Sequence, residues 1–208
     1  LNKYIMEDIF DTSFDSIVNP YESFSHGLVS SKLWLCEKLE NVIDNENIVN
    51  PSLHMLASWD NLLTFMLLTR RPKFYGVVNA YDMDSKSTTN ANKICDYWKF
   101  EYPKVYNHTQ DINKLSFSNT GTESIFINTS VDQIDNTTWY DVIPKDKLVC
   151  LQTTNLPTTT TEWHIKQSYN IITDFTETYK VSKLIYCDSI DINYGHLKFK
   201  RLMMIGIK

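Results

Sequence analysis

One segment, residues 74–92, constrains the fold of this 208-residue chain more than any other. It begins with a largely apolar run at 75–81, continues through the acids Asp82 and Asp84, and ends in a polar stretch typical of a helix start. Such an apolar run predicts a strand that is buried on both faces, as in a parallel sheet. Ligands of open α/β sheets bind outside the carboxyl ends of these strands. We therefore expect Asp82, ahead of Asp84, to accept hydrogen bonds from ligand hydroxyls such as those of a ribose.

Apolar segments of strand length alternate with segments of helical periodicity along most of the chain, which is typical of βαβ units. Strands are expected at 51–58, 75–81, 104–106, 124–128 and 147–152, helices at 30–43, 62–68 and 90–98, and a helix or turn at 139–143. Two further β-rich runs, 184–187 and 199–207, are joined by a polar loop at 188–196 that is too short for a crossover helix. These two runs should pair antiparallel. The pattern predicts an α/β fold with a seven-stranded, mostly parallel sheet and an antiparallel C-terminal hairpin.

The length predicts one α/β domain at 51–208, with an N-terminal arm and an amphipathic helix at 1–50 packed on it. The net charge of −5 and the pI of about 5.5 argue against broad nucleic-acid binding through a basic surface. We find no apolar run long enough to cross a membrane. The four cysteines are widely separated and are expected to be buried free thiols in a reducing, cytoplasmic setting. The histidines have no metal-ligand spacing, so no metal site is expected.

The predicted layout resembles that of class I S-adenosylmethionine-dependent methyltransferases, which have a Rossmann-like sheet, and the likeness covers about residues 53–207. The motif YDMD, residues 81–84, resembles the family's acidic motif after the second strand. This resemblance implies that Asp82 holds the ribose of S-adenosylmethionine. Asp111 and Ile112 resemble the next motif, which implies that they meet the adenine edge.

The sequence FINTSVDQI, residues 126–134, is similar to the family's fourth motif, which faces the methyl group and the substrate. The resemblance implies that three residues line the methyl-transfer site: Asn128, Thr129 and Ser130. Residues 139–155 and 199–206 resemble small methyltransferase-like proteins encoded by bacteriophages, which implies a location in the host cytoplasm.

The first motif departs from the family pattern. In the family it is a glycine-rich turn, because only a residue without Cβ allows close backbone contact with the cofactor at positive φ. Here the turn reads ASWDN, residues 57–61, without glycine, and Met55 stands near the place of the acid that precedes the turn. The cofactor contacts that the resemblance assigns to this turn are Ala57, Ser58, Trp59 and Asp60. We expect this degenerate glycine loop to weaken cofactor binding.

Several of these residues also have a purely structural interpretation. Asp84 and Asp60 are good helix N-caps, and His54 alternates with apolar neighbours as a hydrogen-bonded core histidine does. Arg201 and its neighbouring lysines fit the exposed face of a strand, and the cations at 70–73 fit a solvated helix end.

Two functions remain open from the sequence. The first is a class I methyltransferase of unknown acceptor, with weak or lost cofactor binding. The second is a catalytically inactive, methyltransferase-like structural or interaction subunit, in a homo-oligomer or a larger assembly such as a viral one. A dehydrogenase-like module is disfavoured because no G-x-G-x-x-G motif occurs.

Overall fold

The predicted strands and helices are present in the computed structural model, which describes residues 25–98, 104–118, 120–160, 164–194 and 197–208. In chain order the elements are α3 (His26–Asn45), β1 (Ser52–Leu56), α4 (Leu62–Arg70), β2 (Val78–Asp82), α5 (Ser85–Trp98), β3 (Val105–Thr109), the 3-10 helix η2 (Ile112–Lys114), β4 (Ser124–Asn128), the 3-10 helix η3 (Val131–Gln133), α6 (Thr138–Asp141), β5 (Leu148–Thr154), α7 (Ile172–Thr178), β6 (Lys183–Tyr194) and β7 (Leu197–Ile207). The N-terminal arm, residues 1–24, lies outside the described residues.

The strands form one sheet in the order β3-β2-β1-β4-β5-β7-β6. β1 pairs in parallel with both β2 and β4, and the outer pairs β2–β3 and β4–β5 are also parallel. β7 runs antiparallel to both β5 and β6. This layout confirms the predicted mostly parallel sheet with a C-terminal hairpin. Because the chain builds outward in opposite directions from β1 and β4, a crevice is expected at the carboxyl ends of these two strands.

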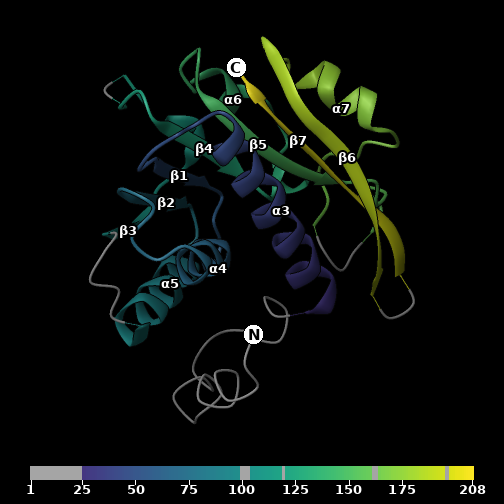
Figure 1. Cartoon of the computed structure of the whole chain (residues 1–208). Helices are drawn as coiled ribbons and strands as arrows, with labels where there is room; N and C mark the ends of the chain where they lie inside the picture. The colour runs from purple at the N-terminus through teal and green to yellow at the C-terminus, as the bar shows by residue number, and fades with distance from the viewer. Residues whose placement is uncertain (1–24, 99–103, 119, 161–163, 195–196) are drawn as a thin grey trace.

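Side-chain alternation along the central strands divides the core between the two faces of the sheet. In β4, Ile125 and Ile127 join the cluster under α3, α4 and α5, whereas Phe126 joins the cluster under α6 and α7. β5 repeats the pattern, with Cys150 on the first face and Leu151 on the second. Figure 1 shows the two helical layers on opposite sides of the sheet. Strands buried on both faces explain the continuous apolar runs of the sequence.

The ends of several elements differ from the sequence predictions. The predicted loop at 188–196 is wrong for 188–194, because β6 pairs with β7 from Asp188↔Met203 to Tyr194↔Leu197. Its polar residues lie on an edge strand, where one face can meet water. α3 begins at His26 and α5 at Ser85, each about one turn or more before the predicted start. The prediction of buried thiols is wrong for Cys187, which is exposed on β6.

α3 packs on the sheet through Leu35, Leu39 and Ile43, which belong to the first core cluster. Two ion pairs tie it to the end of α4, since Arg70 donates to both carboxylate oxygens of Glu40 at 2.8 Å and Arg71 pairs with Asp44. The predicted solvated helix end is therefore a paired one. Among the described helices, none is both long and apolar enough to cross a membrane.

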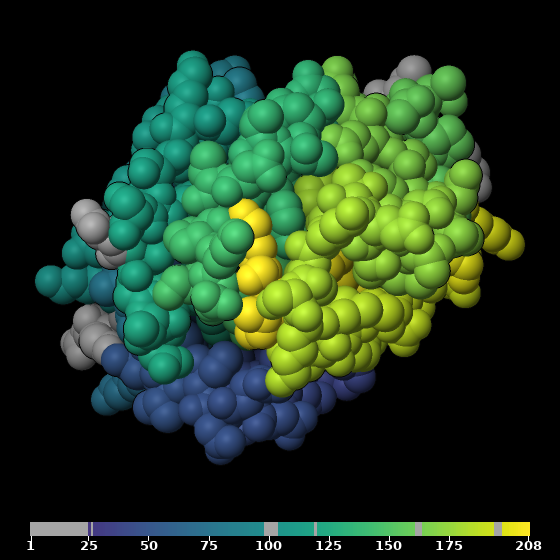
Figure 2. All heavy atoms as spheres, turned by 90° about the horizontal axis from the view of Figure 1, so that it is seen from above, coloured from purple at the N-terminus to yellow at the C-terminus, as the bar shows by residue number. Residues whose placement is uncertain are grey.

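The C-terminus lies at the end of the sheet where the parallel strands begin, away from their carboxyl ends. Figure 2 shows its yellow residues between the green segment around α6 and the yellow-green segment of α7 and β6. The Lys208 ammonium donates to the main-chain oxygens of Tyr140 and Ile143, each at 2.6 Å. A cation at these carbonyls stabilises the end of α6.

Gly206 is required where β7 meets the irregular start of β6. A Cβ at this position would lie 2.7 Å from the Lys183 main-chain oxygen and 3.0 Å from Val181 Cγ2, whereas a Cβ at Gly121 would meet nothing within 4 Å. We expect Gly206→Ala to lower the free energy of unfolding by about 1–3 kcal/mol, because it forces the two strands apart. Gly121→Ala is the control, and chemical denaturation of both variants is the measurement. Equal stability of the two variants would show that the strands separate without cost.

Candidate functional site

The turn after β1 adopts the backbone conformation of a glycine-rich turn without containing glycine. Ala57, Trp59 and Asn61 have φ values of 50°, 51° and 57°, in the left-handed region that favours glycine. Two main-chain N–H groups hold the turn: that of Ser58 donates to the Tyr81 main-chain oxygen at 3.0 Å, and that of Trp59 donates to Asp82 Oδ2 at 2.8 Å. Asparagine tolerates this region well, but alanine and tryptophan are strained there by about 1–3 kcal/mol each. The turn thus keeps its path through contacts with β2.

Asp82 ends β2 and lies directly beside this turn. Its Oδ1 accepts from the Asp84 main-chain N–H at 2.9 Å, while its Oδ2 accepts from that of Trp59. Burial raises the pKa of the Asp82 carboxyl, although these hydrogen bonds oppose the shift. Asp84 has another role, because its carboxylate accepts from the main-chain N–H groups of Lys86 and Ser87 at 3.1 and 3.3 Å. The structure therefore confirms Asp84 as the N-cap of α5.

Two adjoining cavities open beside Asp82 at the carboxyl edge of the sheet. The main cavity has a volume of about 540 Å³ and extends from the turn past Thr129 to α3 and β7. The side cavity, of about 310 Å³, extends towards the ends of β3 and η3. Five residues line both cavities: Ala57, Asp82, Met83, Gln133 and Ile134. The main cavity is in the size range of small-molecule sites.

The side cavity contains the predicted residues that follow β3. Asp111 and Ile112 both line it. Asp111 also caps η2, because its Oδ1 accepts from the Asn113 main-chain N–H at 3.0 Å. Met83, which the sequence analysis did not assign, is 76% exposed and lines both cavities. A large apolar residue between the two acids that follow the strand was the sequence signal that could have identified it.

The segment after β4 places Thr129 and Ser130 in the main cavity, but not Asn128. Asn128 is fully buried and lines neither the main nor the side cavity. Its Oδ1 accepts from the Ser130 main-chain N–H at 2.8 Å, and the Ser130 hydroxyl donates to the Ala57 oxygen at 3.3 Å. Asn128 therefore shapes the turn that presents Ser130 to the cavity.

A buried ion pair on the far wall of the main cavity was missed by the sequence analysis. Arg201 Nη1 lies 3.1 Å from Asp132 Oδ1, with side chains only 8% and 5% exposed, and Arg201 Nη2 also donates to the Thr129 main-chain oxygen. The interpretation of Arg201 as part of an exposed strand face is thus wrong. Side chains alternate along the start of β7, and Arg201 belongs to the inward-facing set. A cation buried in this way requires a partner.

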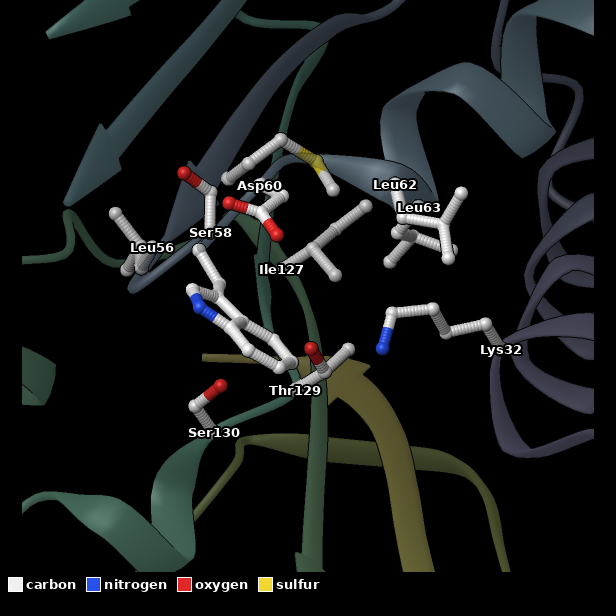
Figure 3. Close-up of a pocket in the computed structure, with 11 residues that line it drawn as sticks. Lys32, Leu56, Ser58, Asp60, Leu62, Leu63, Ile127, Thr129 and Ser130 are labelled. Atoms are coloured by element: carbon white, nitrogen blue, oxygen red, sulfur yellow. The ribbon is translucent and has the colours of Figure 1, made fainter. Parts of the chain in front are cut away.

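Lys32 was also missed, and it reaches the cavities from α3. Figure 3 shows its side chain extending from the helix towards Thr129, in a small pocket that also contains Ser58 and Asp60. Burial, and then the charge of Arg201, lower the pKa of the Lys32 ammonium from 10.5 to about 8. Asp60 is only 4% exposed, and its Oδ1 accepts from Asn90 Nδ2 at 3.4 Å. Asp60 therefore helps to hold the turn against α5.

The predicted structural role of His54 is confirmed, but not its hydrogen bonding. His54 is stacked on Phe126 at a centroid distance of 4.6 Å, and its buried Nδ1 has no partner among the described residues. Burial lowers the pKa of the imidazole to about 4, so it is neutral at physiological pH. In the described part of the chain, no group of three or more His, Cys, Asp or Glu side chains is placed to hold a metal ion.

Neither a protein-family model nor a curated protein matches the sequence. Solved structures do match the fold. Magnesium protoporphyrin IX methyltransferase (ChlM) from Synechocystis PCC 6803, a structure with bound S-adenosylmethionine, aligns with a TM-score of 0.61 at 14% identity over 99% of this chain and 98% of that one. N-methyltransferase NodS from Bradyrhizobium japonicum WM9, in complex with S-adenosyl-L-homocysteine, aligns with a TM-score of 0.63 at 10% identity over 92% and 93%. The alignment with TehB from Haemophilus influenzae has a TM-score of 0.58 at 13% identity and covers 81% of this chain but 62% of TehB.

The chain has the class I methyltransferase fold. Within this methyltransferase fold, all but one of the site residues assigned from the sequence line one of the three cavities. The exception is the buried Asn128, and the residues that line a cavity are Ala57, Ser58, Trp59, Asp60, Asp82, Asp111, Ile112, Thr129 and Ser130.

Proposed function

We propose that the chain is a methyltransferase that binds S-adenosylmethionine across the two cavities, with the methyl acceptor in the main cavity. The observation that carries the proposal is the Asp82 carboxylate at the end of β2, at the point where the two cavities join. Its oxygens accept from the main-chain N–H groups of Trp59 and Asp84, and a carboxylate has further acceptor capacity for a ribose hydroxyl. ChlM and NodS, which share the fold, are methyltransferases with S-adenosylmethionine or its product bound.

The residues around Asp82 fit the other parts of this cofactor. Met83 and Ile112 provide apolar surface for the adenine in the side cavity, and Asp111 lies at the adenine edge. The amino-acid part of the cofactor would follow the turn at Ala57 into the main cavity. Thr129 and Ser130 then line the region where the methyl group and the acceptor meet.

The proposed chemistry needs positioning more than acid–base catalysis. When bound, S-adenosylmethionine supplies an activated methyl group on a good sulfonium leaving group. The chain's own residues orient the two reactants: Asp82 fixes the ribose, while the walls formed by α3, the segment after β4 and β7 hold the acceptor in line. The absence of a catalytic triad among the residues assigned to the site is compatible with this role.

A non-enzymatic subunit is the second candidate, and Trp59 is the observation that favours it. Trp59 lies at a left-handed position of the turn, and its side chain lines the main cavity that the cofactor would share. The turn is therefore a degenerate glycine loop in our proposal. The bacteriophage affiliation, the host-cytoplasmic location, the division at residues 50 and 51, and a homo-oligomeric or larger assembly remain predictions.

Binding of S-adenosylhomocysteine, measured by calorimetry and thermal shift, tests the proposed function. At about one hundred times its dissociation constant the ligand should stabilise the fold by about 2.7 kcal/mol and raise the melting temperature by roughly 5–10 °C. A folded protein that shows no binding at millimolar ligand would instead support the non-enzymatic subunit.

The substitution Trp59→Gly tests the turn. We expect it to tighten S-adenosylhomocysteine binding by about tenfold, because it relieves a left-handed φ and removes a Cβ beside the cofactor. Asn47→Gly is the matched control, since Asn47 has a φ of 54° in the turn after α3, where it lines none of the three cavities. Weaker binding by Trp59→Gly would mean that the indole contributes a ligand contact.

A further inference from the structure

Lys32 places a cation inside the site. This cation has no counter-ion in the described part of the structure. Its side chain lines both the main cavity and the small pocket of Figure 3. No hydrogen bond or ion pair joins its ammonium to any described residue, whereas the lysine Lys38 on the same helix pairs with Glu37 at 2.8 Å. A half-buried ammonium without a partner is costly unless a ligand supplies the negative charge.

The charges that face Lys32 come from three surrounding elements and from α3 itself. Arg201 on β7 repels the ammonium, while Asp132 on η3, Asp60 in the turn after β1 and the Cys36 thiol on α3 favour its charged form. The two acids have partners of their own, because Asp132 pairs with Arg201 and Asp60 accepts from Asn90. Both carboxylates that favour the Lys32 ammonium are therefore engaged by other residues, and neither forms an ion pair with Lys32.

The main cavity that Lys32 lines also has apolar side chains among its mostly polar lining residues. Leu28 on α3, Ile134 after η3 and Phe199 on β7 line it together with Lys32. Arg201 adds a second cation, and its buried Nε has no hydrogen-bond partner among the described residues. The combination suits a ligand with an apolar body and one anionic end. Lys32, Leu28 and Phe199 line the main cavity and not the side cavity, whereas Asp111 and Ile112 line only the side cavity. The region around Lys32 therefore remains available after the nucleoside is placed.

We propose that the methyl acceptor is a small apolar carboxylic acid whose carboxylate binds Lys32 Nζ, with its body against Phe199, Leu28 and Ile134. This inference rests on the proposed function and names the substrate class of the same site. The amino-acid carboxylate of the cofactor is the other possible source of an anion at Lys32, and the experiment distinguishes the two.

The test follows the pKa of Lys32 by NMR in protein labelled with [ε-13C]lysine, with its signal identified by its loss in Lys32→Met. The probes are S-adenosylhomocysteine, 5′-methylthioadenosine, which lacks the amino-acid part, and benzoate, with benzamide as its uncharged counterpart. We expect benzoate to raise the Lys32 pKa by about one unit in the presence of S-adenosylhomocysteine, because a nearby anion favours the ammonium. Benzamide and the two nucleosides should leave this pKa unchanged.

Benzoate affinity supplies a second readout. We expect Lys32→Met to weaken it about tenfold and Lys32→Arg to retain most of it, because a charge-assisted hydrogen bond is lost in the first and kept in the second. Lys38→Met is the matched control on α3 and should bind as the wild type does. Binding should also weaken as the pH rises through the Lys32 pKa, where the ammonium loses its proton.

Two results would overturn the inference. One is a Lys32 pKa that rises with S-adenosylhomocysteine but not with 5′-methylthioadenosine or benzoate, which would assign the ammonium to the cofactor's carboxylate. The other is a Lys32 pKa that benzoate does not change, together with a benzoate affinity that is equal in the wild type and Lys32→Met. If neither nucleoside binds, the proposed function fails, and the benzoate measurements on the free protein still report on the anion site.

Discussion

Replacing Arg201 by methionine should lower the free energy of unfolding by about 3–5 kcal/mol, because it leaves a buried carboxylate without its partner. Asp132 and Arg201 are 3.1 Å apart with side chains that are 5% and 8% exposed. Burial raises the pKa of the Asp132 carboxyl, and Arg201 is the largest influence that opposes this shift. Without Arg201 the carboxyl must either remain charged in a poorly solvated place or bind a proton.

Two further variants make this prediction specific. Asp132→Asn combined with Arg201→Met should recover at least half of the lost stability in urea denaturation, because it removes the unpaired charge. Arg71→Met breaks the exposed pair with Asp44 and should have a much smaller effect. Equal losses for Arg201→Met and Arg71→Met would show that the Asp132–Arg201 pair does not anchor the segment after β4.

Replacing Asp82 by asparagine should weaken S-adenosylhomocysteine binding by about 10- to 100-fold, which corresponds to about 1.5–3 kcal/mol for lost charge-assisted hydrogen bonds. Asparagine keeps the size of the side chain but has only one acceptor atom for the Trp59 N–H, the Asp84 N–H and the ribose. Because burial raises the Asp82 pKa, affinity in the wild type should also decrease as the pH falls through that raised value. Calorimetry over a pH series measures both effects.

Asp84→Asn is the matched control for Asp82. It removes the same charge two residues away, and asparagine remains a good N-cap for α5. The affinity of Asp84→Asn for S-adenosylhomocysteine should stay within about threefold of the wild type, because the asparagine oxygen can accept hydrogen bonds from the same capping turn. A larger loss in Asp84→Asn than in Asp82→Asn would transfer the ribose contact to Asp84.

The sequence by itself determined the strands and the first ligand-binding candidate. The apolar runs at β1, β2, β4 and β5 identify strands buried on both faces, because helices cover both sides of the sheet. Asp82 and Asp84 could be given separate roles from their positions alone, since one ends a strand and the other precedes a helix. These features depend on local order along the chain, which the sequence displays directly.

Only the tertiary structure decided which charged residues share the site. Arg201 and Asp132 are 69 residues apart in sequence, and Lys32 comes from a helix that precedes the sheet, so no local pattern relates the three. The second half of β6, residues 188–194, was likewise predicted as a loop, because it is mostly polar and its pairing with β7 at the edge of the sheet is not visible in the local sequence. The left-handed turn at Ala57 and Trp59 depends on main-chain bonds to β2 that form only when β1 and β2 pair. Burial and pairing across the fold, rather than residue type alone, therefore give these side chains their charge and position.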